Sequence, residues 1–240
     1  MNLKNKTALV TGAGRGIGRA IGIALAKEGV RLVLVSRTLS ELEETRDLLK
    51  PFSVPVFIFT TDVGSPQQIQ MLFKELNSFC VDGLNFLINN AGYAPRLQFI
   101  EETDEAEWEK IININLSGVY RMCRAALPLL KKAGSGIVIN IASIAGTSGY
   151  EKFTGLGAYS AAKAGVVTLT EVLAREVEKD HIGVFTISPG AVDTRMLREL
   201  VPQLKADLKP EDIAAKVVDI LKGRVKETSG SNIVIADKKL

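Results

Sequence analysis

The sequence predicts a doubly wound α/β fold, in which helices cover both faces of a mostly parallel sheet of about seven strands in a three-layer domain. Short apolar runs alternate with segments of helical periodicity along almost the whole chain. The runs are apolar at consecutive positions, as expected for strands buried on both faces. No repeat, linker or low-complexity stretch interrupts the 240 residues, so we expect one domain, residues 1–240.

Each expected strand is an apolar run that ends in a turn signal. These runs lie at residues 7–10, 31–35, 56–59, 84–88, 137–141, 184–187 and 233–235. Between them, apolar residues recur at helical spacing. Helices are expected at 17–25, 41–50, from Pro66 onward, 115–130, 158–179 and 213–221. Ser65 and Pro66 suit the cap and first residue of a helix, and Gly29 suits the position after a helix end.

The amino-acid composition argues against several classes of partner and of catalytic site. The 30 Lys and Arg against 27 Asp and Glu are interspersed, so neither nucleic acid nor a membrane surface is an expected partner. No apolar run approaches a membrane span, and residues 1–6 do not resemble a signal peptide, so we expect a cytoplasmic protein. Cys80 and Cys123 read as reduced, buried thiols. The lone histidine, His181, stands in an expected surface turn, which excludes a histidine-based triad or a histidine-rich metal site.

The first strand and the first helix are separated by four glycines at alternate positions, Gly12, Gly14, Gly16 and Gly18. Backbone N–H groups and the positive end of a helix can hold a pyrophosphate at such a turn. A glycine-rich turn without a ligand is the alternative, but glycines at a helix start are unfavourable unless something approaches the backbone closely. The spacing, which starts at Thr11 and reads T-G-x-x-x-G-x-G, differs from the common G-x-G-x-x-G fingerprint, whose last position would fall on Ile17.

The end of the second strand bears on the choice of cofactor. Ser36 and Arg37 stand where an NAD-binding fold usually places an acidic residue. No acid is present at this strand end to bind both ribose hydroxyls or to repel a 2′-phosphate. Arg37 can hold that phosphate from one side, and Arg15 from the other. The sequence therefore predicts NADPH rather than NADH, unless both arginines are only solvated.

Tyr159 and Lys163 are four residues apart on an expected helix, so their side chains lie one turn from each other on one face. A free tyrosine titrates near pH ~10 and is a poor base at neutral pH. A neighbouring ammonium supplies ~1 kcal/mol in water and ~4 kcal/mol in a partly desolvated cleft. The pair can therefore carry acid–base chemistry only in a pocket that excludes much of the water. For the motif taken alone, an ordinary surface pair is the alternative.

Ligands of a doubly wound sheet bind beyond the carboxyl ends of its strands. The glycine loop and Arg37 fall at that edge. Four further residues follow strand ends, namely Asp62, Asn89, Ser143 and Pro189. We therefore expect these residues to meet at one edge of the sheet.

Together, these motifs resemble the short-chain dehydrogenase/reductase family over residues 7–194. The resemblance rests on the glycine motif at 11–18, Asp62, Asn89-Asn90-Ala91-Gly92, Asn115, Ser143, Tyr159-x3-Lys163 and Pro189-Gly190. In general character the chain is most similar to the 3-oxoacyl-[acyl-carrier-protein] reductase branch. The resemblance implies a Rossmann-type domain and an oxidoreductase that needs no metal.

The resemblance also implies the catalytic residues Asn115, Ser143, Tyr159 and Lys163. Tyr159 would protonate the carbonyl oxygen as hydride arrives, and Ser143 would donate a hydrogen bond to that oxygen. Lys163 would bind the nicotinamide ribose and lower the pKa of Tyr159. Asn115 would hold a water behind Lys163 as a proton path.

Cofactor contacts are implied in the same way. Asp62 would touch the adenine, Asn89 the adjoining ribose, and Pro189-Gly190 with Thr194 the nicotinamide. The full expected set is Thr11, Gly12, Gly14, Arg15, Gly16, Ile17, Gly18, Ser36, Arg37, Asp62, Val63, Asn89, Ala91, Gly92, Tyr159, Lys163, Pro189, Gly190, Val192 and Thr194.

The C-terminal part departs from the pattern of many relatives. The segment 195–209, which would cover the substrate, is short. It suits an open pocket for varied or carrier-borne substrates, or a small pocket. The tail, 236–240, lacks the paired glycines of relatives, which argues against their tail-mediated subunit contact. An acidic acyl carrier protein would need basic residues at the mouth, for which the candidates are Lys131, Lys132, Arg195 and Arg198.

The expected helix at 158–179 carries two stripes. The larger side chains are Ala162, Val166, Leu169, Leu173 and Val177, and the smaller ones are Ala161, Gly165, Thr168 and Val172. Two stripes indicate that the helix is buried on two sides, against the sheet on one side and against another subunit on the other. A homo-oligomer, either a dimer or a tetramer, is therefore expected.

The sequence thus predicts an NADPH-dependent reductase of a small-molecule carbonyl. One candidate substrate is a 3-oxoacyl thioester on an acyl carrier protein, which would place the enzyme in fatty acid biosynthesis. A dehydrogenase that oxidises an alcohol or a hydroxysteroid is the enzymatic alternative. An alternative of another class is a nucleotide-sensing protein without chemistry, which would be expected to lack Tyr159, Lys163 or Ser143; all three are present.

Overall fold

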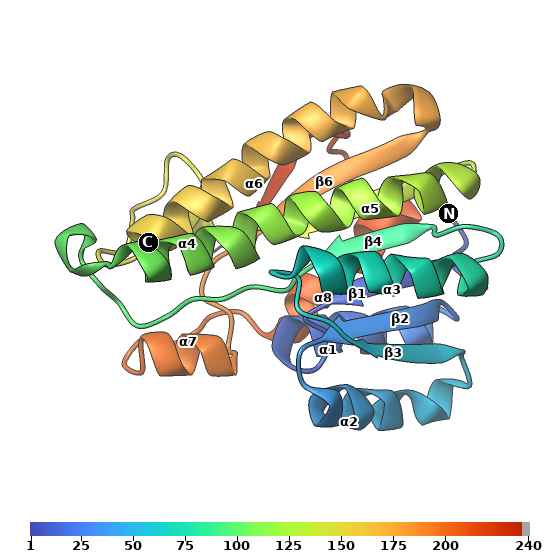
Figure 1. Cartoon of the computed structure of the whole chain (residues 1–240), viewed down its shortest axis with the longest axis horizontal. Coiled ribbons are helices and arrows are strands. Elements are labelled where there is room, and N and C mark those ends of the chain that lie inside the picture. Colours follow the sequence, from blue (N-terminus) through green and yellow to red (C-terminus); the bar gives the residue numbers. More distant parts are fainter. Residues whose placement is uncertain (237–240) are drawn as a thin grey trace.

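The computed structural model describes residues 1–236, so the expectation for the tail at 237–240 lies outside the described residues. Its strands form one sheet in the order β3-β2-β1-β4-β5-β6-β7, and neighbouring strands are parallel (Figure 1). They are β1 (Thr7–Thr11), β2 (Arg31–Ser36), β3 (Val56–Thr60), β4 (Phe86–Asn89), β5 (Gly136–Ile141), β6 (Ile182–Pro189) and β7 (Asn232–Ile235). The predicted doubly wound fold is confirmed.

Helices cover both faces of this sheet and complete the three layers of a Rossmann-type fold (Figure 1). One face carries α1 (Gly16–Lys27), α2 (Leu39–Leu49) and α8 (Pro210–Lys222). The other face carries α3 (Pro66–Phe79), α5 (Gly118–Lys132) and α6 (Gly157–Glu176). Two shorter helices, α4 (Glu105–Ile112) and α7 (Arg195–Leu200), follow the loops that leave β4 and β6.

Adjacent residues of a central strand point into different hydrophobic cores. In β1, Ala8 and Val10 pack in the core that includes α1, whereas Leu9 packs in the core that includes α3 and α5. All three side chains are fully buried. This burial on two sides explains why the strand is apolar at consecutive positions.

The chain from Glu105 to Lys132 is one continuous helical run, because a π-helical segment, Asn113–Ser117, joins α4 to α5. The helix expected at 115–130 is therefore the second half of a longer helical run that begins at Glu105. Asn115 lies inside the π segment and donates to the carbonyls of Ile111, at 2.9 Å, and Tyr93, at 2.7 Å. Such π segments are rare and frequently lie at functional sites.

Several element boundaries differ from the prediction by a few residues, and one short helix is not predicted at all. α6 ends at Glu176 rather than Lys179, because Glu178–Asp180 form a tighter turn and His181 is left-handed, with φ of 55°. The sequence patterns do not predict α7, which is only six residues long. Among residues 1–236, no helix combines the length and the apolar character needed to cross a bilayer.

The strand order reverses between β1 and β4, because the chain moves outward from β1 to β3 and then returns to the middle of the sheet. Such a reversal leaves a crevice at the carboxyl ends of the strands. Gly18 of α1 packs beside this crevice, where an added Cβ would lie 2.2 Å from the carbonyl oxygen of Gly12. Only a residue without a side chain lets α1 pack this closely.

We expect Gly18→Ala to lower the free energy of unfolding by about 1–3 kcal/mol, because the added methyl group forces the backbone apart. Gly22→Ala, one turn later in α1, is the matched control, since its Cβ would meet Leu34 at an ordinary 3.5 Å. The control should be neutral or stabilising by about 0.5–1 kcal/mol. Urea denaturation followed by circular dichroism measures both, and equal effects would contradict the close approach.

Candidate active site

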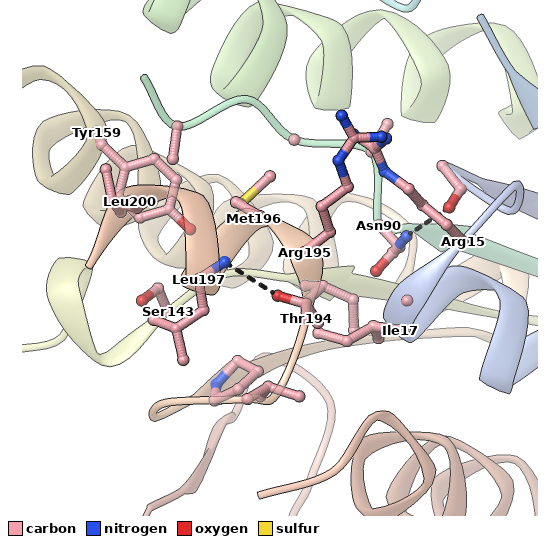
Figure 2. Close-up of a pocket in the computed structure, with 18 of the residues that line it drawn as sticks. Arg15, Ile17, Asn90, Ser143, Tyr159, Thr194, Arg195, Met196, Leu197 and Leu200 are labelled. Atoms are coloured by element: carbon pink, nitrogen blue, oxygen red, sulfur yellow. Dashed lines mark hydrogen bonds between the residues drawn. The ribbon is translucent and has the colours of Figure 1, made fainter. Parts of the chain in front are cut away.

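A cleft of about 600 Å³ crosses the carboxyl ends of the strands, and Figure 2 shows part of its lining. The glycine loop, the ends of the central strands and α7 all contribute. Most of the predicted site residues line it, namely Gly12, Gly14, Arg15, Gly16, Ile17, Ser36, Arg37, Asp62, Val63, Ala91, Gly92, Ser143, Tyr159, Lys163, Pro189, Gly190, Val192 and Thr194.

Thr11 and Gly18 lie beneath the floor of the cleft rather than in its lining. The Thr11 hydroxyl accepts the backbone amides of Asn90, at 2.9 Å, and Ala91, at 3.0 Å. The Asn90 side chain donates back to the Thr11 carbonyl at 3.0 Å. These bonds tie the loop after β4 to the end of β1, and they bring Asn90, which has no predicted contact role, into the lining.

Asn89 is buried in the core, at 2% exposure, and does not line the cleft. Its Nδ2 donates to Oδ1 of Asn140 at 2.9 Å and to Sγ of Cys123 at 3.2 Å. This placement corrects the expected contact of Asn89 with the ribose. As the last residue of β4, Asn89 points into the face that α5 and α6 cover.

Asn115 is also fully buried and lies behind the lining. Its Oδ1 accepts the backbone amide of Tyr93 at 3.1 Å, while its Nδ2 donates to the Tyr93 carbonyl. The side chain thus holds the loop after Gly92 against the π segment. A Cβ on Gly92 would lie 3.1 Å from Oδ1 of Asn115 and 3.8 Å from Nζ of Lys163. Asn115 is therefore near Lys163, and its role in holding water stays a prediction.

The glycine loop presents an anion site. Arg15 occupies the N-cap of α1 in an extended conformation, and no side chain caps the helix. The first turn contains no acidic residue. The free N–H groups and the positive end of α1 therefore face the cleft at Gly16 and Ile17. This arrangement fits the pyrophosphate of a dinucleotide.

The end of the cleft beside the glycine loop contains an acidic side chain that the sequence patterns do not predict. Arg15 forms an ion pair with Glu41 of α2, with 3.0 Å between Nη1 and Oε1. Glu41 lines the cleft near Gly14 and Ser36, because the two side chains and the loop converge there. Arg15 and Glu41 are 26 positions apart in the sequence, so no local sequence pattern predicts this ion pair.

At the reacting end, α6 carries both Tyr159 and Lys163 in its first turns. Lys163 is 3% exposed, and its Nζ donates to the carbonyl of Ile141, the last residue of β5, at 2.8 Å. The same Nζ lies 5.6 Å from the centroid of the Tyr159 ring. Ser143 follows β5, and its Oγ accepts the amide of Ala145 at 3.1 Å, which leaves the hydroxyl proton available.

Burial raises the pKa of Tyr159 to about 12, and a hydrogen bond with Ser143 offsets part of this rise. Burial lowers the pKa of Lys163 to about 8. The net pKa of Tyr159 is therefore raised, because loss of hydration outweighs the other contributions, and the lowering expected from Lys163 stays a prediction. At neutral pH, Tyr159 is a protonated phenol, which is the form of a proton donor.

A chain of hydrogen bonds from the last strand supports Ser143. The Ser188 hydroxyl donates to Oδ1 of Asn232 at 2.7 Å, and Asn232 donates to the Thr147 hydroxyl at 3.2 Å. Thr147 in turn donates to the carbonyl of Ser143 at 3.1 Å. Since Ser188 precedes Pro189, the chain connects the two loops at the reacting end. No sequence pattern predicts the part of Asn232 in this chain of hydrogen bonds, because Asn232 lies 44 residues after Ser188.

Near Ser143 and Tyr159 many lining side chains are apolar, and the two α7 arginines that also line the cleft, Arg195 and Arg198, are held in ion pairs. α7 contributes Leu197 and Leu200, which share this end of the cleft with the two reacting side chains (Figure 2). The remaining apolar side chains here are Ala94, Ile144, Ala145, Phe153, Leu156, Met196, Val201 and Leu204. The cleft therefore has a polar half that suits a dinucleotide and an apolar half that suits a carbonyl compound.

A family model described as short chain dehydrogenase matches residues 6–205. An uncharacterized oxidoreductase of Staphylococcus aureus (strain USA300) is 38% identical over 216 residues, which is 90% of each chain. The 3-oxoacyl-[acyl-carrier-protein] reductase FabG of Vibrio harveyi is 37% identical over 200 residues, which is 83% of this chain and 79% of FabG.

Solved structures agree with these sequence relatives. Levodione reductase has a TM-score of 0.89 at 28% identity and is matched over 97% of this chain and 96% of its own. A 3-ketoacyl-ACP reductase from Sinorhizobium meliloti has a TM-score of 0.85 at 29% identity, over 95% and 96% of the two chains. Carveol dehydrogenase from Mycobacterium avium, solved with NAD, shares the fold, with a TM-score of 0.87 at 22% identity over 98% and 97%.

The buried ammonium of Lys163 should make stability depend on pH. Since burial lowers its pKa from 10.5 to about 8, the folded protein binds fewer protons than the unfolded chain between these values, and stability rises with pH there. We expect Lys163→Met to be more stable than wild type by roughly 1–3 kcal/mol at pH ~7. The difference should shrink by pH ~10.

Urea denaturation at the two pH values measures this effect. Lys132→Met is the matched control, because Lys132 is exposed and should show no such pH-dependent gain. A constant difference between Lys163→Met and wild type would contradict a charged, desolvated Lys163.

Proposed function

The chain belongs to the short-chain dehydrogenase family, and from this premise we propose that it is an NADPH-dependent reductase that converts a carbonyl into an alcohol. The family makes it an oxidoreductase that uses NAD(P)(H) and acts on small molecules. The observation that carries the proposal is that Tyr159 and Ser143 line one cleft together with the uncapped N-terminus of α1 and its glycine loop.

Different residues of the chain would bind different parts of the cofactor. The N-terminus of α1 and its glycine loop would hold the pyrophosphate, Asp62 the adenine, and Pro189-Gly190 with Thr194 the nicotinamide. A bound NADPH supplies the hydride that adds to the carbonyl carbon.

Tyr159 supplies the proton. As negative charge grows on the carbonyl oxygen, the O–H bond of Tyr159 breaks and a new O–H bond forms on the substrate. Ser143 donates a hydrogen bond to the same oxygen and stabilises that charge. The ammonium of Lys163 lies near enough to stabilise the tyrosinate that remains, and a proton from solvent restores the phenol. In the reverse direction Tyr159 would accept the alcohol proton.

The preference for NADPH rests on the charges at the adenosine end. Arg37 lines the cleft, and among the lining arginines of residues 1–236 it alone forms no ion pair. A 2′-phosphate would give it a partner and would strengthen binding through a charge-assisted hydrogen bond. Glu41 opposes that phosphate, but its charge is balanced by Arg15 at 3.0 Å.

A 3-oxoacyl thioester is a specific substrate candidate, because FabG is 37% identical and its name assigns it 3-oxoacyl-[acyl-carrier-protein]. The similarity to levodione reductase supports a different compound, the one in that protein's name. Both relatives agree with reduction of a carbonyl rather than with a nucleotide sensor.

A homo-oligomer, dimer or tetramer, is part of the proposal, as is a cytoplasmic location. The small-residue stripe of α6 supports the former. Ala161 and Thr168 are exposed, and Val172 is 49% exposed, so this face of the helix is available to a second subunit.

Tyr159→Phe should reduce kcat by about 10²–10⁴-fold, because the proton donor is lost while the ring remains. The dissociation constant for NADPH should stay within about threefold, since the hydroxyl is not needed to hold the pyrophosphate. Stopped-flow kinetics and a fluorescence titration measure the two quantities. Tyr120→Phe, at a side chain that is 48% exposed on α5, is the matched control. A fully active Tyr159→Phe enzyme would exclude the proposed role.

Arg37→Asp should lower kcat/KM for NADPH by about 10–100-fold and raise it for NADH, because a carboxylate repels the 2′-phosphate and can bind ribose hydroxyls. Arg46→Asp on α2 is the control, since Arg46 does not line the cleft. The ratio of kcat/KM values for the two cofactors measures the preference. An unchanged ratio in Arg37→Asp would mean that Arg37 is only solvated.

A further inference from the structure

Resting on the proposed carbonyl reduction, we propose that the substrate is a compact, uncharged, apolar ketone that the enzyme takes free from solution rather than from an acidic carrier protein. The hydride and the Tyr159 proton add across its C=O bond and give a secondary alcohol. Two independent observations support this substrate class: the chemistry of the cleft beyond Tyr159, and the charge around its mouth.

At the substrate end of the cleft the hydroxyls of Ser143 and Tyr159 can bind one oxygen atom, and the two arginines of α7 that line the cleft, Arg195 and Arg198, are already paired with Glu199 and Asp193. Ser143 and Tyr159 converge there, and the side chains around them include Ile144, Phe153, Leu156, Met196, Leu197 and Leu200. Burying a carboxylate or phosphate among these groups would leave it without a hydrogen-bond partner, which is strongly unfavourable. An apolar body gains from the same lining, because its burial is driven by the hydrophobic effect.

The segment that covers this end carries little net charge. Residues 195–209 contain four cations and two anions, and Asp193 just before them adds a third anion, so the net charge of 193–209 is +1. Arg195 pairs with Glu199, with 2.6 Å between Nε and Oε1, and Arg198 pairs with Asp193. The arginines expected to attract an acidic carrier are therefore balanced within the same segment.

The two lysines expected to help them lie at the wrong end of the sheet. Lys131 and Lys132 end α5, just before β5 begins at Gly136, whereas Ser143 follows the other end of that strand. The six residues of β5 span about 20 Å at ~3.3 Å per residue. Lys131 is moreover paired with Asp180 at 2.7 Å. These lysines cannot form a basic face with α7 at the mouth of the cleft.

The ammonium of Lys152, beside the mouth of the cleft, already has hydrogen-bond partners within the chain. Lys152 precedes Phe153, and its ammonium donates to the backbone carbonyls of Ile144 and Thr147. It thereby fixes the loop after Ser143 instead of presenting a free charge to an incoming protein. The apolar lining and the nearly balanced charge of the covering segment thus point to the same class of substrate.

Two matched pairs of substrates test this proposal by steady-state kcat/KM with NADPH. The first pair is methyl pentyl ketone and the same ketone with a terminal carboxylate, for which we expect a preference of about 30-fold or more for the neutral compound. The second pair is acetoacetyl-N-acetylcysteamine and acetoacetyl-acyl carrier protein. We expect a ratio within about threefold, with no fall of the carrier rate as salt increases.

Leu200→Asn tests the apolar lining directly. It should weaken binding of the neutral secondary alcohol, measured by isothermal titration calorimetry in the presence of NADP⁺, by about tenfold, because an amide replaces apolar contact area. Leu48→Asn is the matched control, since Leu48 is 50% exposed on α2 and outside the cleft. The control should bind the alcohol as wild type does.

The outcomes separate this inference from the proposed function. A carrier-bound thioester that reacts more than tenfold faster than its truncated analogue, with a salt-sensitive rate, would overturn the inference and leave carbonyl reduction intact. Equal rates for the neutral and carboxylated ketones, or equal effects of the two leucine variants, would also overturn it. If neither ketones nor thioesters are reduced, the proposed function itself fails.

Discussion

The hydrogen bond from the Lys163 ammonium to the Ile141 carbonyl joins α6, the helix that carries Tyr159, to the end of β5. A charged group at 3% exposure is unfavourable to bury, so this bond constrains where α6 can lie. It places Tyr159, one turn earlier, opposite Ser143, which follows the same strand as Ile141. A second buried hydrogen bond joins the same strand and helix, because Asn140, the residue before Ile141, donates to Thr170 of α6 at 2.9 Å.

The parts of this site that sequence could predict are the local ones. A spacing of four residues defines the Tyr159 and Lys163 pair whatever surrounds it, and alternate glycines before a helix define the pyrophosphate loop. The parts it could not predict depend on packing between distant segments. Glu41 reaches Arg15 across 26 residues, and Asn89 turns into the core because Asn140 offers a partner there. Likewise, the rise in the pKa of Tyr159 follows from burial, which spacing alone cannot give.

The two ends of the cleft differ in chemistry. Arg15, Arg37 and Glu41 line it near the glycine loop, whereas apolar side chains from the loop after β5 and from α7 line it near Tyr159, where the α7 arginines are held in ion pairs. The short covering segment reaches both ends, because Thr194 lies beside Gly16 of the glycine loop and Leu200 lies near Tyr159 (Figure 2). Under the proposed function, this difference would let one fold hold a charged cofactor next to an uncharged reactant, with the Ser143 and Tyr159 hydroxyls between them.

The most direct test of this account is a crystal structure of the enzyme with NADP⁺ and a secondary alcohol. The account predicts that the alcohol oxygen lies within about 3.2 Å of both the Tyr159 hydroxyl and Ser143 Oγ, with its apolar body against α7. An alcohol bound elsewhere, or a Tyr159 hydroxyl turned toward bulk solvent and away from the nicotinamide, would contradict it.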